Sequence, residues 1–356
     1  MRDFRRFSKP KRLRPSLRHV HAVWARPKQR GFLSMIQAQA IAFARTAPAP
    51  LLPTCLGLIG LGMVWRKAAA YLAAPYWLGE AAVIGSLAVF AAVATLYLSS
   101  TLSQPGALRA DVRAKAGRSA VPAGSEALML SGAALLPLAP GVAPFVWTAG
   151  IFLHVFLMTL VFRELRAMGP AEWAPTGFLV VPFVGLIVAP IGGGPLGEQA
   201  LGAPGIAAAL FWWSLLLYLA LLPAAAWRLA TQPTEPRLRP GAYVLLAPPS
   251  VAVIGYDKLD PEGGLTVGLF ALSLVILAVL ARHRRWLMGD GFAPTWGCFT
   301  FPSAAFAGAC LTMAARNPDL LWRGVAAAAT LGATAITTYV ALRMLAAWRA
   351  GRIVTL

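Results

Sequence analysis

The chain has 356 residues, of which 58% are hydrophobic and 13% are charged, and its formal net charge is +19. A soluble domain carries about a quarter charged residues, so this composition excludes an ordinary soluble domain. The apolar residues also form uncharged blocks of about 18 residues or more, the length at which a helix crosses the hydrocarbon core of a bilayer. The sequence therefore predicts an all-α membrane protein.

The first 45 residues precede every apolar block and hold 12 of the 32 Lys and Arg residues. A secretory signal would place a short apolar stretch directly behind its basic start, and this segment has none. We expect residues 1–47 to be a retained, partly disordered cytoplasmic tail that fixes the orientation of the chain. Binding of anionic lipid or nucleic acid is the alternative reading of such a charge run, and of these two we expect membrane lipid as a partner and no nucleic acid.

Ten membrane spans are predicted, within a transmembrane domain over residues 48–345 that is followed by a short cytoplasmic tail over 346–356. With both termini in the cytoplasm, 27 of the 32 Lys and Arg residues fall on the cytoplasmic side, as the positive-inside rule requires. This arrangement is typical of a multi-pass protein of the plasma or inner membrane. The spans lie near residues 48–66, 80–100, 124–140, 144–162, 175–192, 204–227, 240–256, 264–281, 295–314 and 324–342.

Proline distinguishes the odd-numbered spans from the even-numbered ones. Proline removes a backbone donor and kinks a helix, so in lipid the freed carbonyl groups need protein or water beside them. The even spans are smooth and apolar all round, which suits contact with lipid. We therefore predict five helical hairpins in a quasi-fivefold ring, with the odd helices inside and lining a central pore. The predicted kinks are at Pro53, Pro137, Pro182, Pro248 and Pro302.

The ninth span combines one large ring with small residues. At helical spacing from Phe301, the neighbours on the same stripe are Gly297, Ala304, Ala305 and Gly308. Such a stripe either packs closely against another helix or lines a narrow pore. If it lines a pore, Phe301 is its gate and those four residues are its lining. The second choice for the gate is the nearby Phe299.

Ionisable groups are almost absent from the predicted spans. Glu126 is placed at a span start, and His154 is the exception on an otherwise apolar span, where we expect a hydrogen-bonded packing residue. Coupled transporters and membrane hydrolases need intramembrane acids, bases or metal ligands. The three cysteines form no C-x-x-C pair. We expect neither an enzyme nor a metal or cofactor, and the missing charges favour a passive pathway, leaning toward small inorganic or organic anions.

The chain resembles the tellurite-resistance/dicarboxylate transporter family, whose members include TehA, the plant slow anion channels, and yeast malate and sulfite transporters. The motif W-x-x-x-T-F-P over 296–302 carries most of the resemblance. The segments Arg-Glu-Leu at 163–165, Pro-x-x-Trp-x-Pro at 170–175 and Leu-Ala-Pro-Pro at 246–249 agree with it, and it covers about 48–345. The resemblance implies a homotrimer in which each protomer has its own pore, closed by the phenylalanine that corresponds to Phe301.

Three functions stay open on the sequence. The leading hypothesis is an anion channel or channel-like uniporter gated by Phe301. The alternative is a coupled exporter of a specific anion, such as sulfite or a C4-dicarboxylate (malate), or a tellurite-resistance protein. A third is a membrane scaffold that recruits a partner through residues 1–45.

Overall fold

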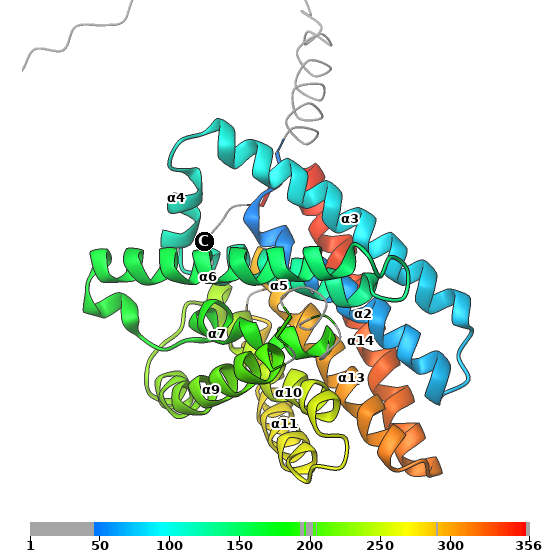
Figure 1. The fold of residues 1–356 in the computed structure, drawn as a ribbon. Coiled ribbons are helices and arrows are strands. Elements are labelled where there is room, and N and C mark those ends of the chain that lie inside the picture. The colour runs from blue at the N-terminus through cyan, green and yellow to red at the C-terminus, as the bar shows by residue number, and fades with distance from the viewer. Residues whose placement is uncertain (1–45, 193–195, 197–201, 204, 290, 354–356) are drawn as a thin grey trace, which may run out of the picture. The chain divides into compact units, whose positions relative to one another are not determined.

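The computed structural model describes residues 46–192, 196, 202–203, 205–289 and 291–353 (Figure 1). All of these belong to one unit of the chain, Gln39–Leu356. The predicted basic tail over 1–47 lies outside the described residues except for its last two positions.

The described residues form α-helices and short 3₁₀ helices (η), and no strand. The 3₁₀ helices are η1 (Ala49–Leu51), η2 (Pro170–Trp173), η3 (Gly185–Gly192), η4 (Pro236–Leu246) and η5 (Pro294–Phe299). The α-helices are α2 (Leu52–Tyr71), α3 (Tyr76–Ser103), α4 (Ala107–Arg113), α5 (Gly117–Leu135), α6 (Ala143–Met168), α7 (Gly177–Val184), α9 (Ile206–Thr231), α10 (Ala247–Leu259), α11 (Leu265–Arg282), α12 (Arg284–Leu287), α13 (Thr300–Arg316) and α14 (Leu320–Arg349).

Eight of the described elements are long and apolar enough to cross a membrane: η1 with α2, α3, α6, α9, η4 with α10, α11, η5 with α13, and α14. The predicted spans 124–140 and 175–192 correspond to two elements outside this set. Helix α5 is more polar because it contains Arg118 and Glu126. Helix α7 and η3 together form a shorter apolar segment, Gly177–Gly192. Helix α14 also continues into the predicted tail, as far as Arg349.

The long elements fall into two groups by burial. In α2, η4–α10 and η5–α13, 72%, 78% and 83% of the most apolar stretch is buried within the chain, whereas in α3, α6, α9, α11 and α14 the share is 22% to 33%. The second group carries exposed aromatic residues such as Phe145, Phe152 and Trp213. An exposed apolar surface of this kind is typical of contact with lipid or with another protein.

Each strongly buried element packs against the lightly buried helix that follows it in the chain (Figure 1). The pairs are α2 with α3, α5 with α6, α7 and η3 with α9, α10 with α11, and α13 with α14. The buried elements also pack on one another, α2 on α13, α13 on α10, α10 on η3, η3 on α5, and α5 on α2.

Prolines mark the changes between 3₁₀ and α geometry, so the prediction that they kink continuous α-helices needs correction. Pro53, Pro248 and Pro302 lie in the first turn of α2, α10 and α13, each directly after a 3₁₀ segment. A proline is tolerated there because the first amide groups of a helix have no partner within it. Pro182 lies inside α7, as predicted. Pro137 follows the end of α5 and lies in a turn, and the proline within that helix is Pro122.

Two of the lightly buried helices donate hydrogen bonds to buried elements that contain 3₁₀ segments. Trp147 of α6 donates from Nε1 to the carbonyl of Ala189 in η3 at 3.1 Å. Tyr218 of α9 donates its hydroxyl to the carbonyl of Leu245 in η4 at 2.7 Å. Both side chains are fully buried. A carbonyl left without a donor in hydrocarbon costs several kcal/mol, so these two side chains hold the irregular segments in place.

Replacing Tyr218 by Phe removes one oxygen atom and leaves the Leu245 carbonyl without this donor. We expect the variant to lose about 1–3 kcal/mol of stability and to lose its monodisperse gel-filtration peak at a temperature several degrees lower in detergent. Tyr339→Phe is the control because that ring is 49% exposed and its hydroxyl receives a bond from Arg343 at the surface. Equal thermal stability of the two variants would contradict the role of Tyr218.

Candidate functional site

A wide cavity with a volume of about 620 Å³ lies between the C-terminal parts of α2, α5, η3 and α10 and the first half of α13. Its lining comes from α2, α5, η3, α10 and α13, and includes Gly60, Leu130, Ile191, Val251 and Ala304. Because residues from all five elements face the same space, this cavity is formed only when the whole chain is folded.

A smaller, apolar pocket of about 50 Å³ adjoins this cavity toward the N-terminal ends of the same elements. Phe301 and Val251 line both spaces. A third space, of about 10 Å³, shares Pro53, Ser119 and Gly297 with the pocket. The three spaces therefore follow one another from the wide end of the five elements to their narrow end.

Phe301 lies where the wide cavity meets the pocket. Its side chain is buried, with the residue 7% exposed. A β-carbon built on Gly60 of α2 would lie 3.3 Å from Cδ2 of Phe301, so the ring leans against the backbone of α2 where that helix has no side chain. The next α2 glycine, Gly57, leaves room for Thr300, whose hydroxyl is 3.0 Å from the Pro53 carbonyl. These close approaches fix the position of α13 beside α2.

The predicted stripe of small residues follows the same line of spaces. Ala304, Ala305 and Gly308 line the wide cavity, and Gly297 lines both smaller spaces. Phe299, the second choice for a gate, lines none of the three and packs instead against the rings of Tyr243 and Trp296, with centroid distances of 5.1 and 5.6 Å. Phe299 is the last residue of η5, two residues before Phe301, so its side chain leaves the helix on a different face from the Phe301 stripe.

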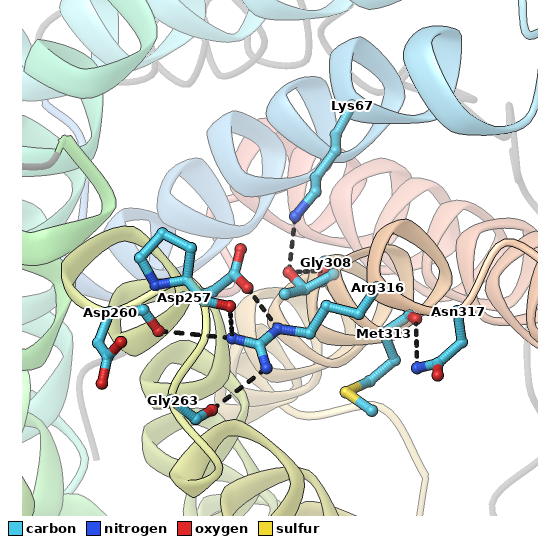
Figure 2. A network of polar contacts seen from close by, with 10 residues as sticks. Lys67, Asp257, Asp260, Gly263, Gly308, Met313, Arg316 and Asn317 are labelled. Carbon is cyan, nitrogen blue, oxygen red and sulfur yellow. Dashed lines mark hydrogen bonds and ion pairs between the residues drawn. The ribbon is translucent and has the colours of Figure 1, made fainter.

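Four charged residues line the wide cavity: Arg66, Lys67, Asp257 and Lys258. Arg66 forms an ion pair with Glu80, with a shortest N–O distance of 2.6 Å. Asp257 forms an ion pair with Arg316 at 2.7 Å (Figure 2). Neither lysine forms an ion pair with any described residue. The described residues that line the cavity therefore carry an excess of positive charge.

Figure 2 shows Lys67 reaching from α2 toward α13. Its ammonium group donates to Oγ1 of Thr312 at 2.6 Å, and Thr312 in turn donates to the carbonyl of Gly308 at 3.0 Å. The ring of Tyr71 lies 5.9 Å from the same ammonium group. Neutral partners of this kind orient the charge without cancelling it.

Further ion pairs lie at the opposite end, around the N-terminal end of α5 and the C-terminal part of α6. Glu164, from the Arg-Glu-Leu segment, accepts from Arg109 and Arg113 at 2.7 Å each. Arg118 of α5 pairs with Glu172 at 2.6 Å, and the hydrogen bond from Arg118 holds the pKa of the Glu172 carboxyl group below its usual range. These contacts connect α4, α5, α6 and η2, and none of their residues lines the three spaces.

The structure corrects the predicted position of Glu126. Because α5 begins at Gly117, Glu126 lies in the middle of this helix and not at the start of a span. Its side chain lines the pocket below Phe301. Its Oε1 atom is buried and has no hydrogen-bond partner among the described residues. His154 lies nearby and is hydrogen-bonded and fully buried, as predicted.

A sequence model of voltage-dependent anion channels (SLAC1) matches residues 48–345. The chain belongs to the voltage-dependent anion channel family. Among known proteins, the S-type anion channel SLAH3 of Arabidopsis thaliana is 24% identical over 274 residues. The matched region covers 70% of this chain and 40% of SLAH3, so the chain spans two fifths of the length of that relative.

Membership of the voltage-dependent anion channel family identifies the chain as a multi-pass membrane protein of an anion channel family and not as an enzyme. No group of three or more His, Cys, Asp or Glu side chains among the described residues could hold a metal ion. The distinctive features of the site are the line of spaces, the Phe301 ring between two of them, and the charges around the wide end.

The wide cavity predicts water access along one face of α2. In a background with the three buried cysteines replaced, Met63→Cys should react with a water-soluble thiol reagent, because Met63 lines the cavity. Ile59→Cys is the matched control one turn away, since Ile59 is fully buried and lines none of the three spaces. Mass spectrometry of the intact protein would measure the labelling. If Met63→Cys reacts no more than Ile59→Cys, water access along this face of α2 is contradicted.

Proposed function

We propose that this chain is an anion channel, or channel-like uniporter, in which small anions pass between the five buried elements and Phe301 closes the path. The observation that carries the proposal is the position of the Phe301 ring between a cavity of about 620 Å³ and an apolar pocket of about 50 Å³. Family membership supports anion conduction. Sequence and packing together support the path and its gate.

The order of contacts among the buried elements supports a ring of five hairpins. Each of α2, α13, α10, η3 and α5 packs on the next in this order, and α5 packs again on α2.

The lengths of α5 and of the α7–η3 segment, the two elements outside the set of eight, support a total of ten spans. At 1.5 Å per α-residue and 2.0 Å per 3₁₀-residue, α5 and the α7–η3 segment are each about 28 Å long. That length is close to the thickness of a bilayer core, about 30 Å.

The Phe301 ring acts as a hydrophobic gate in this proposal. The pocket on its N-terminal side is lined by Leu56, Val181, Val184 and other apolar groups. An anion must lose its hydration shell to enter such a neck, and a narrow apolar constriction excludes water as well. Rotation of one side chain away from Gly60 would widen the neck without moving a helix. In this proposal the Phe301 ring is therefore the movable part of the gate.

The charges around the wide end support anions as the permeant class. Lys67 and Lys258 have no carboxylate partner among the described residues. A positive side chain in the mouth of a pore attracts anions and repels cations. Since Lys67 is held by neutral partners, its charge stays available to an anion in the cavity. This supports selection at the mouth and closure at the neck.

We also propose that the protein lies in the plasma or inner membrane with both termini in the cytoplasm, on the strength of its Lys and Arg distribution. A homotrimer is proposed on the family resemblance, and the exposed aromatic residues of α6 and α9 offer apolar surface for lipid or other copies.

A coupled exporter is the second candidate, and the buried carboxyl group of Glu126 beside the path is the observation that favours it.

Replacing Phe301 by Ala should raise anion conductance at least about tenfold in planar bilayers, because each ~1.4 kcal/mol removed from the barrier increases the rate tenfold. Phe299→Ala is the matched control: it deletes the same ring two residues away, outside the three spaces. We expect its conductance to equal that of the unmodified chain. A correctly folded Phe301→Ala variant with unchanged current would exclude the gate.

Replacing Lys67 by Gln should lower anion conductance about two- to fivefold at low ionic strength, because the Coulomb energy of an anion near the cavity mouth is lost. The difference should shrink in concentrated salt, where charges are screened over a few ångströms. Lys115→Gln removes an exposed charge between α4 and α5, outside the wide cavity, and controls for net charge. A decrease for Lys67→Gln that is the same at all salt concentrations would contradict an electrostatic role.

A further inference from the structure

The carboxyl group of Glu126 is an unexplained polar group in the apolar pocket. The residue is 4% exposed, and Oε1 has no hydrogen-bond partner among the described residues. Around it the pocket is lined by apolar side chains such as Val184 and Val251 and by the ring of Phe301. An acidic side chain aimed into the neck of a proposed anion path needs a reason, since as a carboxylate it would repel the anion.

The surroundings of Glu126 place it firmly in this position. A β-carbon on Gly185, at the start of η3, would overlap both Oε1 of Glu126 and Cε1 of His154. Both side chains therefore fill the space that this glycine leaves open. The imidazole nitrogen atoms of His154 point elsewhere: Nδ1 is 2.9 Å from Oγ of Ser125, and Nε2 is 3.2 Å from the Pro182 carbonyl. The Cε1 edge of His154 thus borders the same space as the Glu126 carboxyl group, and neither imidazole nitrogen is directed to that group.

The Pro182 carbonyl is available to His154 because of the local backbone. Gly185 donates to Val181 at the end of α7, and the chain then continues as the 3₁₀ helix η3. Where the backbone hydrogen bonds change from four-residue spacing to three-residue spacing, one carbonyl group receives no backbone donor. Because Gly185 donates to Val181, the carbonyl left without a backbone donor is that of Pro182. The break in this inner element therefore anchors His154, and His154 in turn borders the space that Glu126 occupies.

No cation among the described residues is paired with Glu126. On α5 itself, Arg118 lies eight residues away, about 12 Å along the helix, and is paired with Glu172. From α2, Arg66 bonds to the carbonyl of Ala134 and to Glu80. From α6 the facing titratable group is His154, and from η5 it is the Cys298 thiol, which lines the same pocket. The lining residues of α2, α7, η3, η4, α10 and α13 are not titratable.

We propose that Glu126 is a proton-binding site in the anion path and that an anion passes when this carboxyl group is protonated. The inference rests on the proposed anion path. In the protonated state the carboxyl group is neutral and can donate its O–H to the anion in a neck that offers few other polar groups. In the ionised state it repels the anion. The site therefore takes a proton and a small anion together, and conduction increases as the pH falls.

The test uses the purified full-length chain in liposomes loaded with potassium chloride or potassium nitrate. Neither anion changes its charge in the tested range, so any pH effect belongs to the protein. Potassium ionophore clamps the potential, and the initial anion efflux is measured with equal pH on both sides, from about pH 5 to about pH 8. We expect the efflux to rise as the pH falls, by up to about tenfold per pH unit where a single group titrates.

Glu126→Gln should remove this pH dependence and hold the efflux at the low-pH level, because its amide group is neutral and can donate a hydrogen bond. Glu126→Asp keeps an acid in a changed position, so its profile should stay pH-dependent but be displaced along the pH axis. Glu235→Gln, which neutralises an exposed carboxylate between α9 and η4, should retain the unmodified profile.

A flat profile in the unmodified chain overturns the inference, and so does an unmodified slope in Glu126→Gln. If Glu126→Gln does not fold, a Glu126→Asp profile identical to that of the unmodified chain overturns it as well. These results leave the anion path intact, because efflux is still present. Absence of efflux at every pH, in the unmodified chain and in Phe301→Ala, contradicts the proposed function itself.

Discussion

The need to pair every backbone polar group away from water governs this structure. Four of the buried elements change between 3₁₀ and α geometry, and each change leaves carbonyl groups that cannot face hydrocarbon. The buried elements are enclosed by helices whose outer face is apolar and whose inner face carries a side chain that donates a hydrogen bond. Trp147 reaches Ala189, Tyr218 reaches Leu245, and His154 reaches Pro182. The division between broken inner elements and smooth outer helices is thus a consequence of where hydrogen-bond partners are available.

The same irregularity shapes the site. A 3₁₀ segment followed by an α-helix brings small residues and prolines to the line of spaces, and glycines allow the elements to approach one another. Gly60 gives the Phe301 ring a place against α2, and Gly185 gives Glu126 and His154 a place beside η3. A wide end whose two lysines form no ion pair with the described residues, and a narrow apolar end with one acid, are different environments for an ion. In the proposed path, attraction and closure are therefore performed by separate residues.

Much of the arrangement follows from the order of residues along the chain. The helical content, the eight elements able to cross a membrane, and the contrast between proline-bearing and smooth segments depend on local composition and spacing. So does the grouping of Phe301 with Ala304, Ala305 and Gly308, because residues three, four and seven apart share one face of a helix. The start of α5 was harder to predict from the sequence. Its buried Arg118 and Glu126 are charged residues, which are typical of a loop followed by a short span.

Contacts between distant segments account for the rest. Pro137 lies beyond α5, and Phe299 turns toward Tyr243, because the end of each element is set by its neighbours. The approach of Glu126 to the pocket and the pairing of Arg66 with Glu80 involve residues on different helices. Hydrophobicity and proline act locally, so the order of residues is enough to specify which segments enter the membrane and which of them are broken. Which side chains meet in the path depends on how separate helices pack, and that is a property of the folded chain alone.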